Sequence, residues 1–563
     1  MGKPGIRTLL DSAVNSLVPW MTAALASAFA TSLIQSQMNL GNLVSMGAPL
    51  TFSAWWRTNL HDLMTFMPFF AVISGSAFLG AFAVASWPTH RWPKHRCLLY
   101  SVAGFAGIFA ALLLTNRLFP LATLIAATRH LTGNLLVLTT GALGGWIFCK
   151  MRPGNRLTGV LDRSGKPVIA RSVALLLIPP AFIASSFMIH RTMMPEREIP
   201  LSDYEGLDYR AEVIAGGLAH PWGIAFLPDG RKLISELSGG VRIVESDGAL
   251  LLEPLRGVPE IMELGQGGLL DIAISPNFEE DRYVFLSYSC GEITASNTCL
   301  SRSELQGNEL VNTELLFQAK PPNATALQFG SRILFLPDNT MLVSVGDGFD
   351  FREEAQNLEE HYGKLLRLTM DGEAPQDNPF YGQEGHYPEI YSYGHRNPQG
   401  LFYDMETNTL YESEHGPYGG DEINIVEMGK NYGWPVTTHG IHYAGDLVSP
   451  YKSLPFVESP IYHWSPSIAP SGITLYRGNE FPQLQGNLLV SALGGMAVFR
   501  LQLEDGQVVK SQRMFHELGK RIRDIKVGPD GGLYLLTDHD PGELLRIVPT
   551  EGRDNRPQAS VWH

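Results

Sequence analysis

The stretch "ILFLPDNTMLVSVGD", residues 333–347, consists of two apolar runs on either side of the turn residues Pro, Asp and Asn. Apolar runs that flank such a turn are typical of a β-hairpin. The same pattern recurs five more times, at 224–236, 272–288, 401–416, 475–493 and 525–538. Six similar units separated by long loops predict an all-β six-bladed β-propeller, and a β-sandwich with insertions is the alternative.

The chain before these hairpins has a different composition. Residues 1–200 carry a net charge of +11, whereas residues 201–563 carry −25. The acidic half argues against nucleic acid as a partner, because phosphate binding needs a basic surface. The basic half contains five charge-free apolar runs, each about as long as a helix that crosses a bilayer, at 17–36, 63–87, 98–116, 131–149 and 172–190.

The basic residues of the short loops predict the orientation of these helices. With a cytoplasmic N-terminus, the inside segments hold 11 Lys and Arg residues and the outside loops hold 3. The positive-inside rule then places everything after about residue 190 outside the cytoplasm, and one re-entrant run would reverse this. We therefore expect an α-helical transmembrane domain at 1–190, a linker at 191–205, the propeller at 206–549 and a C-terminal tail at 550–563. The expected location is the inner (cytoplasmic) membrane, with the propeller on the periplasmic side.

The four cysteines fit this division. Cys97 and Cys149 lie at the ends of apolar runs, whereas Cys290 and Cys299 flank a short polar loop between two strand-like runs. In an oxidising compartment the second pair is expected to form a disulfide, and two free thiols are the alternative.

Polar residues gather in the loops between the predicted strands. Gln328, Arg332 and Asp347 surround the hairpin at 333–347. Near Gly416-Pro417, exposed carbonyls and the carboxylates of Asp421 and Glu422 suit Ca²⁺. Zn²⁺ is not expected, because no His/Cys cluster has ligand spacing along the chain. Three arginines suit the carboxylates or phosphates of a planar ligand, namely Arg396, Arg521 and Arg523.

Six motifs occur in a fixed order between about 210 and 549: "HPWGIAFLPDG", "GQGGLLD", "YGHRNPQG", "GPYGGDEIN", "KNYGWP" and "RIRD". Together they resemble the PQQ-dependent soluble glucose and aldose sugar dehydrogenases, the glucose/sorbosone dehydrogenase group, whose fold is a six-bladed propeller. The membrane half resembles no family that we can name.

The resemblance implies a role for each matching residue. It implies that the carbonyls of Gly416 and Pro417 hold the Ca²⁺ under the PQQ quinone, and that Glu422 binds a second, structural Ca²⁺. Gln266 matches a residue that faces the sugar. The implied contacts of the PQQ carboxylates are Arg396, Asn397, Ser467, Arg521 and Arg523. The implied reaction takes the proton of the anomeric hydroxyl and transfers the C1 hydride to the quinone.

Two positions depart from the family pattern. The family has a histidine base where this chain has Gln328, although the aspartate that polarises it is present as Asp347. The family also has a lysine near the quinone where this chain has Gly494. A general base contributes about 10²–10⁴-fold in rate. The catalytic pair is therefore expected to be Gln328 and Asp347, with Asp347 acting through a water.

Three functions follow from these features. The first is a membrane-anchored PQQ- and Ca²⁺-dependent oxidoreductase that oxidises a sugar and passes electrons to a respiratory quinone or cytochrome. The second is a catalytically silent propeller that binds carbohydrate or protein, as in the related hedgehog-interacting proteins. The third is a transporter with an accessory propeller, which is weaker because the apolar runs carry no charges.

Overall fold

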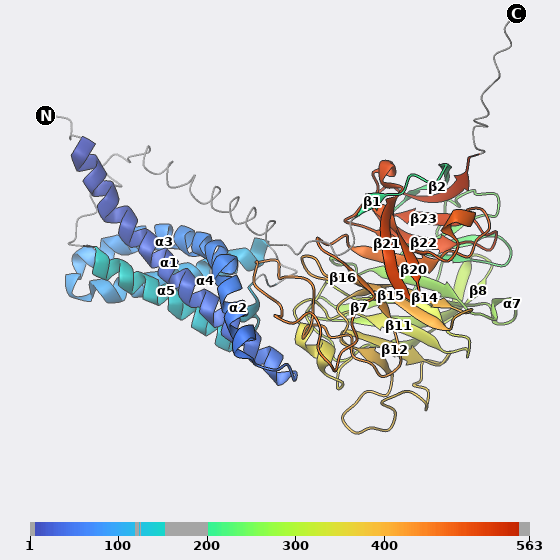
Figure 1. Ribbon diagram of the computed structural model, residues 1–563, viewed down its shortest axis with the longest axis horizontal. Helices are drawn as coiled ribbons and strands as arrows, with labels where there is room; N and C mark the ends of the chain where they lie inside the picture. The colour runs from blue at the N-terminus through green and yellow to red at the C-terminus, as the bar shows by residue number, and fades with distance from the viewer. Residues whose placement is uncertain (1–5, 119–122, 124, 153–200, 551–563) are drawn as a thin grey trace, which may run out of the picture. The chain divides into compact units, whose positions relative to one another are not determined.

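The computed structural model describes residues 6–118, 123, 125–152 and 201–550, in two compact units (Figure 1). The first unit contains the helices and the segment Gly440–Lys452, and the second contains the strands. The predicted span at 172–190 lies outside the described residues, as do most of the predicted linker and all but the first residue of the predicted tail.

Four long helices coincide with the first four predicted apolar runs. By length and composition, Leu17–Ser45, Phe66–Arg91, Pro93–Arg117 and Leu131–Met151 are able to cross a membrane. A shorter helix that the apolar runs did not indicate lies between the first two, and it begins where the Thr51 hydroxyl accepts a hydrogen bond from the Ala54 N–H at 3.1 Å. The helices are α1 (Ile6–Ser45), α2 (Phe52–Met64), α3 (Phe66–Arg91), α4 (Arg96–Leu118) and α5 (Leu131–Met151).

Glycines bring α4 and α5 into close contact. A Cβ atom at Gly104 would lie 2.0 Å from the Gly141 carbonyl oxygen, and one at Gly145 would lie 1.9 Å from that of Tyr100. Small residues are typical of such backbone-to-backbone packing between membrane helices. A disulfide between Cys97 and Cys149, which the sequence analysis did not predict, joins the same two helices.

The segment Gly440–Lys452 belongs to the first unit although it lies far from the helices in sequence. The Gln35 amide donates to Asp446 Oδ2 at 2.7 Å, and the Leu447 N–H donates to Asp62 Oδ1 at 2.9 Å. Asn39 Nδ2 donates to the carbonyl of Leu447 at 2.8 Å. These buried polar contacts attach the segment to α1 and α2. It falls within residues 206–549, which the sequence analysis assigned to the propeller.

The strands of the second unit form six sheets, which confirms the six-bladed propeller. The first sheet contains β3 (Pro221–Phe226), β4 (Lys232–Glu236) and β5 (Val241–Val244), and the second contains β6 (Leu269–Ile274), β7 (Tyr283–Glu292), β8 (Ala295–Gln306) and β9 (Glu309–Gln318). The third contains β10 (Ile333–Phe335), β11 (Met341–Val345), β12 (Lys364–Leu368) and β13 (Ile390–Tyr393). The fourth contains β14 (Pro398–Asp404), β15 (Thr409–Glu414), β16 (Asp421–Ile425) and β17 (Tyr462–Trp464).

The last two sheets include strands from the start of the propeller. The fifth contains β18 (Pro470–Leu475), β19 (Leu488–Ala492), β20 (Ala497–Glu504), β21 (Gln507–Met514) and β1 (Ser202–Asp203), which pairs parallel to β21. The sixth contains β22 (Ile522–Val527), β23 (Leu533–Thr537), β24 (Gly542–Pro549) and β2 (Tyr209–Leu218), which pairs antiparallel to β24. The ring is therefore closed by strands from both ends of the propeller.

Each of the six predicted hairpins forms the first two strands of one sheet. The predicted disulfide between Cys290 and Cys299 is present and joins β7 to β8. The first strands pack against one another in the cyclic order β3, β6, β10, β14, β18, β22. They are thus the innermost strands, and they surround the axis of the propeller.

Candidate functional site

The predicted site residues share one position in the hairpin of each sheet. In an antiparallel pair, the start of one strand and the end of its partner lie at the same end of the sheet. The residues that precede or begin the first strands are Gln266, Gln328, Arg396, Asn397, Ser467, Arg521 and Arg523, and those that follow the second strands are Asp347, Gly416, Pro417 and Gly494. The fold therefore brings residues from five sheets to one end of the axis, although these residues lie in separate motifs along the sequence.

Gln266, Gln328 and Asp347 meet at the rim beside the third sheet. The Gln328 N–H donates to Gln266 Oε1 at 2.8 Å, and the Gly348 N–H donates to the Gln328 carbonyl at 3.4 Å. The Gln328 side chain is buried, and its Oε1 has no hydrogen-bond partner among the described residues. Asp347 accepts from the Trp434 indole N–H at 2.7 Å and from the Phe349 N–H at 2.8 Å. Trp434 is thus a site residue that we did not single out from the sequence.

The backbone around this rim adopts an unusual conformation. Gln328, Ser331 and Phe349 have φ values of 57°, 83° and 66°, although none of them is glycine. Side chains other than glycine rarely adopt this left-handed region, and such residues cluster where the surrounding structure holds a functional group in place. The strained segment coincides with the position expected for catalysis.

Arg396 and Asn397 connect this rim to the Gly-Pro turn. The Asp347 N–H donates to the Arg396 carbonyl at 2.8 Å, and the Gly330 N–H donates to Asn397 Oδ1 at 3.1 Å. The Arg396 guanidinium donates to the carbonyl oxygen of Gly416 at 2.6 Å. That oxygen is an expected Ca²⁺ ligand, and a cation beside a guanidinium is repelled. Calcium at this turn therefore requires Arg396 to release the carbonyl.

His415 accepts a hydrogen bond at its carbonyl from Arg396, one of the expected cofactor arginines, at 2.9 Å. Burial and then the positive charges of Arg396, Arg523 and Arg521 lower the pKa of the His415 imidazole to about 3. Its Nε2 is buried without a hydrogen-bond partner among the residues that the structure describes. The neutral imidazole and the three cations fit a flat anionic ligand such as PQQ, since carboxylates would pair with the guanidiniums.

Arg521 and Arg523 already share one carboxylate. Asp538 Oδ2 lies 3.0 Å from Arg521 Nη2 and 3.2 Å from Arg523 Nη2. Burial alone would raise the pKa of Asp538, but the charge of Arg523 and the hydrogen bond from Arg521 outweigh it and lower the pKa to about 2. Arg523 Nε keeps no hydrogen-bond partner in the described part of the chain. Two guanidiniums that share one carboxylate keep a net positive charge, so this pair can bind a further anion.

Ser467 and Gly494 lie beside a second turn at the same end. Asp421 Oδ2 accepts from the Ser467 hydroxyl at 2.7 Å and from the Ile468 N–H at 2.6 Å. The Ser467 hydroxyl thus contacts Asp421, and its expected contact with PQQ stays a prediction. A Cβ atom at the exposed Gly494 would lie 3.1 Å from the Ile468 carbonyl. The position of the missing lysine is thus adjacent to this turn.

Arg332 is not a rim residue. It is buried, and its Nη1 lies 3.3 Å from Asp271 Oδ1 and 3.2 Å from Asp524 Oδ2. Its guanidinium also lies 4.3 Å from the centre of the Trp222 ring. The three charged residues come from β6, the start of β10 and β22. Their ion pairs connect three innermost strands and make Arg332 a structural cation.

Glu422 lies in β16, opposite Glu414 of β15. Burial and then the charge of Glu414 raise the pKa of the Glu422 carboxyl. Its predicted role as a ligand of a structural Ca²⁺ stays a prediction.

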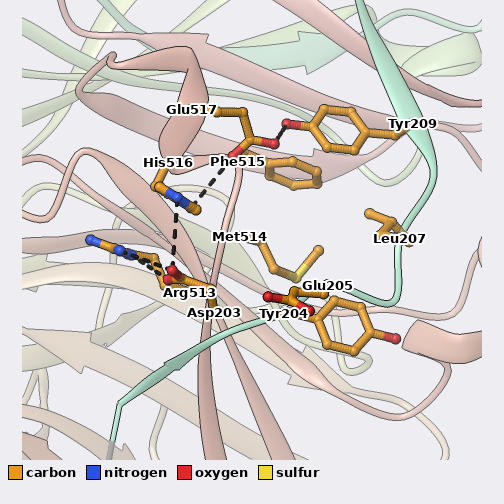
Figure 2. Close-up of a pocket in the computed structure, with 10 residues that line it drawn as sticks. All are labelled: Asp203, Tyr204, Glu205, Leu207, Tyr209, Arg513, Met514, Phe515, His516 and Glu517. Carbon is orange, nitrogen blue, oxygen red and sulfur yellow. Dashed lines mark hydrogen bonds and ion pairs between the residues drawn. The ribbon is translucent and has the colours of Figure 1, made fainter.

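A separate pocket of about 340 Å³ contains none of the predicted site residues. Figure 2 shows its lining, which comes from residues 203–209 and from 513–517 at the end of β21. Because β1 and β21 are the outer strands of the fifth sheet, this pocket lies away from the axis.

Comparison with known proteins identifies the family of the chain. The family model "Glucose / Sorbosone dehydrogenase" matches residues 218–546. An aldose sugar dehydrogenase of Escherichia coli K12 is 40% identical over 343 residues, which cover 60% of this chain and 92% of that protein. An uncharacterised protein of Synechocystis is 38% identical and covers 66% of this chain and 94% of that protein.

Solved structures give the same result. The apo form of the soluble aldose sugar dehydrogenase of E. coli has a TM-score of 0.59 at 39% identity and covers 61% of this chain and 100% of that one. The PQQ-bound aldose sugar dehydrogenase of Streptomyces coelicolor has a TM-score of 0.50 at 28% identity and covers 61% and 98%. The chain therefore belongs to the glucose/sorbosone dehydrogenase family.

Proposed function

We propose that this chain is a membrane-anchored, PQQ-dependent dehydrogenase that oxidises a sugar, with an aldose as the substrate class. The observation that carries the proposal is the group of three cations at one end of the axis, where Arg396 donates to the His415 carbonyl at 2.9 Å and Arg521 and Arg523 share Asp538. This arrangement supports an anionic planar ligand at the end of the axis, and the family membership supports PQQ as that ligand. Bound PQQ would supply an ortho-quinone that accepts the C1 hydride, and a respiratory quinone or cytochrome would then take the electrons.

The residues of the chain would bind and orient the sugar and move one proton. Gln266 holds the backbone of Gln328 and is proposed to face the sugar. An amide cannot accept a proton at ordinary pH, so we assign Gln328 the task of holding a water through its free Oε1. Asp347 then takes the proton of the anomeric hydroxyl through that water, and the product is the lactone. Gly416 and Pro417 would hold Ca²⁺ after Arg396 turns toward the cofactor.

The second candidate is a silent binding propeller. It is favoured by the amide at position 328 and by the hydrogen bond that Arg396 gives to Gly416. Such a propeller keeps the ring and the buried polar contacts but does not need PQQ.

The test is PQQ binding by the full chain in detergent, with Ca²⁺ present. We expect stoichiometric binding, and a panel of aldoses should then reduce the bound quinone and change its absorbance. Arg523→Gln should weaken PQQ binding, because this largely buried guanidinium pairs with Asp538 at the proposed cofactor site. Arg513→Gln, on the outer strand β21, is the control and should bind as the wild type does. Absence of PQQ binding by the wild type would refute the dehydrogenase and leave the binding propeller.

We also propose that the propeller lies on the periplasmic side of the inner membrane. This orientation rests on the distribution of Lys and Arg in the loops. It places Cys97 and Cys149 at the cytoplasmic end of α4 and α5, where glutathione and thioredoxin keep accessible thiols reduced. It places the Cys290–Cys299 bridge outside the cytoplasm.

Trapping thiols in growing cells tests this orientation. Although the structure joins Cys97 to Cys149, this orientation exposes that pair to the reducing cytoplasm. We therefore expect alkylation followed by mass spectrometry to find Cys97 and Cys149 as thiols in growing cells and Cys290 and Cys299 oxidised. The reverse pattern, with Cys290 and Cys299 as free thiols, would show that the orientation is inverted. The comparison is internal, since both pairs belong to one chain.

A further inference from the structure

A buried polar face lies on the fourth sheet, beside the proposed cofactor turn. Glu412 and Glu414 are two residues apart on β15, so their side chains point to the same face. Asn424 and Glu422 of β16 lie opposite them, since Glu412 pairs with Asn424 and Glu414 pairs with Glu422. Three carboxyl groups and one amide therefore share one face.

His395 adds an imidazole to this group. It is fully buried, and it stacks on Tyr432 with ring centres 4.8 Å apart. Its Nε2 lies 2.8 Å from the Ser392 hydroxyl, while its Nδ1 lies 3.8 Å from Glu414 Oε1. One ligand atom from each of His395, Glu412 and Glu414 lies within 4.8 Å of the other two.

Several atoms of this group lack a hydrogen-bond partner in the described part of the chain. They are His395 Nδ1, Glu412 Oε1 and Asn424 Oδ1, and all three side chains are completely buried. The Asn424 amide holds the two carboxylates, because its Nδ2 donates to Glu412 Oε2 at 2.9 Å and to Glu414 Oε1 at 3.2 Å. Buried polar atoms are normally satisfied, so an atom left without a partner indicates a missing ligand.

The charges point to a cation. Among the described residues, no Lys or Arg is recorded in an ion pair with Glu412, Glu414 or Glu422, and the basic side chain beside Glu414 is His395, at 3.8 Å. Buried carboxylates are stable only when they are paired, protonated or bound to a metal. One divalent ion would neutralise Glu412 and Glu414 and would satisfy His395 Nδ1 as well.

We propose that His395 Nδ1, Glu412 and Glu414 bind one divalent transition-metal ion, with Zn²⁺ as the best fit. An imidazole nitrogen favours such ions, whereas Ca²⁺ prefers six to eight oxygen ligands. Zinc bonds to nitrogen and oxygen are about 2.0–2.2 Å long, so donors bound to one ion lie at most about 4 Å apart. The three donor atoms therefore need to move inward by less than about 1 Å.

The ion would hold together two parts of the proposed cofactor site. His395 directly precedes Arg396, and Glu414 directly precedes His415 and the Gly416-Pro417 turn. Glu414 Oε2 already accepts from the backbone N–H of Arg396 at 2.5 Å. This role does not depend on PQQ, so the metal site can be correct even if the proposed dehydrogenase is not.

Zinc binding by the full chain in detergent tests the proposal. After treatment with a chelator, ZnCl₂ is titrated in the presence of excess Ca²⁺, and bound zinc is counted per chain. We expect one Zn²⁺ per chain in the wild type. His395→Gln and Glu412→Gln should weaken binding by at least the ~10–100-fold that loss of a supporting residue costs at metal sites. Glu427→Gln, an exposed control on the same segment, should bind as the wild type does.

Two further results separate this site from its neighbours. Glu422→Gln should retain zinc; loss of zinc in that variant, with retention in Glu412→Gln, would overturn the assignment of ligands. X-ray absorption of the zinc-loaded wild type should show one imidazole and oxygen ligands at about 2.0–2.2 Å. This measurement needs no variant, so it holds even if the substitutions prevent folding. Absence of stoichiometric zinc, or displacement of zinc by equimolar Ca²⁺, would also overturn the proposal.

Discussion

Gln328→His is expected to raise the rate at which sugar reduces bound PQQ by on the order of 10²–10⁴-fold, the usual contribution of a general base. The substitution puts an imidazole at a residue whose backbone already contacts the Gln266 side chain and the N–H of Gly348, which follows Asp347. It should not add backbone strain, because residue 328 already has a φ of 57° as glutamine and histidine tolerates this region comparatively well. Single-turnover reduction of PQQ, followed by quinone absorbance, measures the rate.

Gln328→Asn is the matched control for this result. Asparagine also tolerates a positive φ, and its amide, like that of glutamine, cannot take a proton. We expect this variant to gain nothing. Equal rates for the His and Asn variants, with PQQ bound in both, would show that position 328 no longer takes part in proton transfer, and this would favour the silent binding propeller.

Arg332→Met is expected to lower the free energy of unfolding by about 3–5 kcal/mol, the usual cost of removing one partner from a buried ion pair. It leaves Asp271 and Asp524 buried at the axis without their shared cation. Arg256→Met is the control, because Arg256 and its partner Glu309 both have largely exposed side chains. Surface pairs of this kind contribute about 0–1 kcal/mol. Denaturant unfolding followed by tryptophan fluorescence gives both values.

The pH dependence of the stability lost in Arg332→Met identifies the cause of the loss. Burial raises the pKa of Asp271, and the charge of Arg332 lowers it, so removal of Arg332 raises the pKa further. In the variant the folded state then binds protons more readily than the unfolded state does. The deficit should therefore shrink as the pH falls below the raised pKa of Asp271 and this carboxyl becomes neutral. A deficit that does not change with pH would mean that Arg332 contributes by packing alone.

The innermost hairpins could be predicted from sequence because their signal is local. Each copy has its turn residues and its apolar strands within one short stretch, as in 333–347. The closing strand β2 carries no such signal, since its partner β24 lies at the other end of the propeller. The attachment of Gly440–Lys452 to α1 and α2 was not predicted for the same reason: its partners Gln35 and Asp62 are remote in sequence.

The same difference between local signals and long-range contacts applies to the candidate site. The resemblance placed Gln266, Gln328 and Asp347 on one rim, and the hydrogen bonds of Gln328 bring it next to Gln266 and the turn after Asp347. The proposed zinc ligands escaped detection because they have no ligand spacing along the chain; register and burial bring His395 to Glu412 and Glu414. The partner of a charged residue in this propeller depends on which strands become neighbours.

The closure of the ring by β2 and β24 determines when the propeller can be completed. Tyr209 of β2 is made near the start of the propeller, but Pro549, to which it pairs, is made near its end. The sixth sheet therefore cannot close before β24 has been made, and contacts so far apart in sequence form slowly. Until then, β2 exposes a strand edge that can pair with another chain. Aggregation and proteolysis should act on this unclosed intermediate, and a truncation that removes β24 should trap the protein in it.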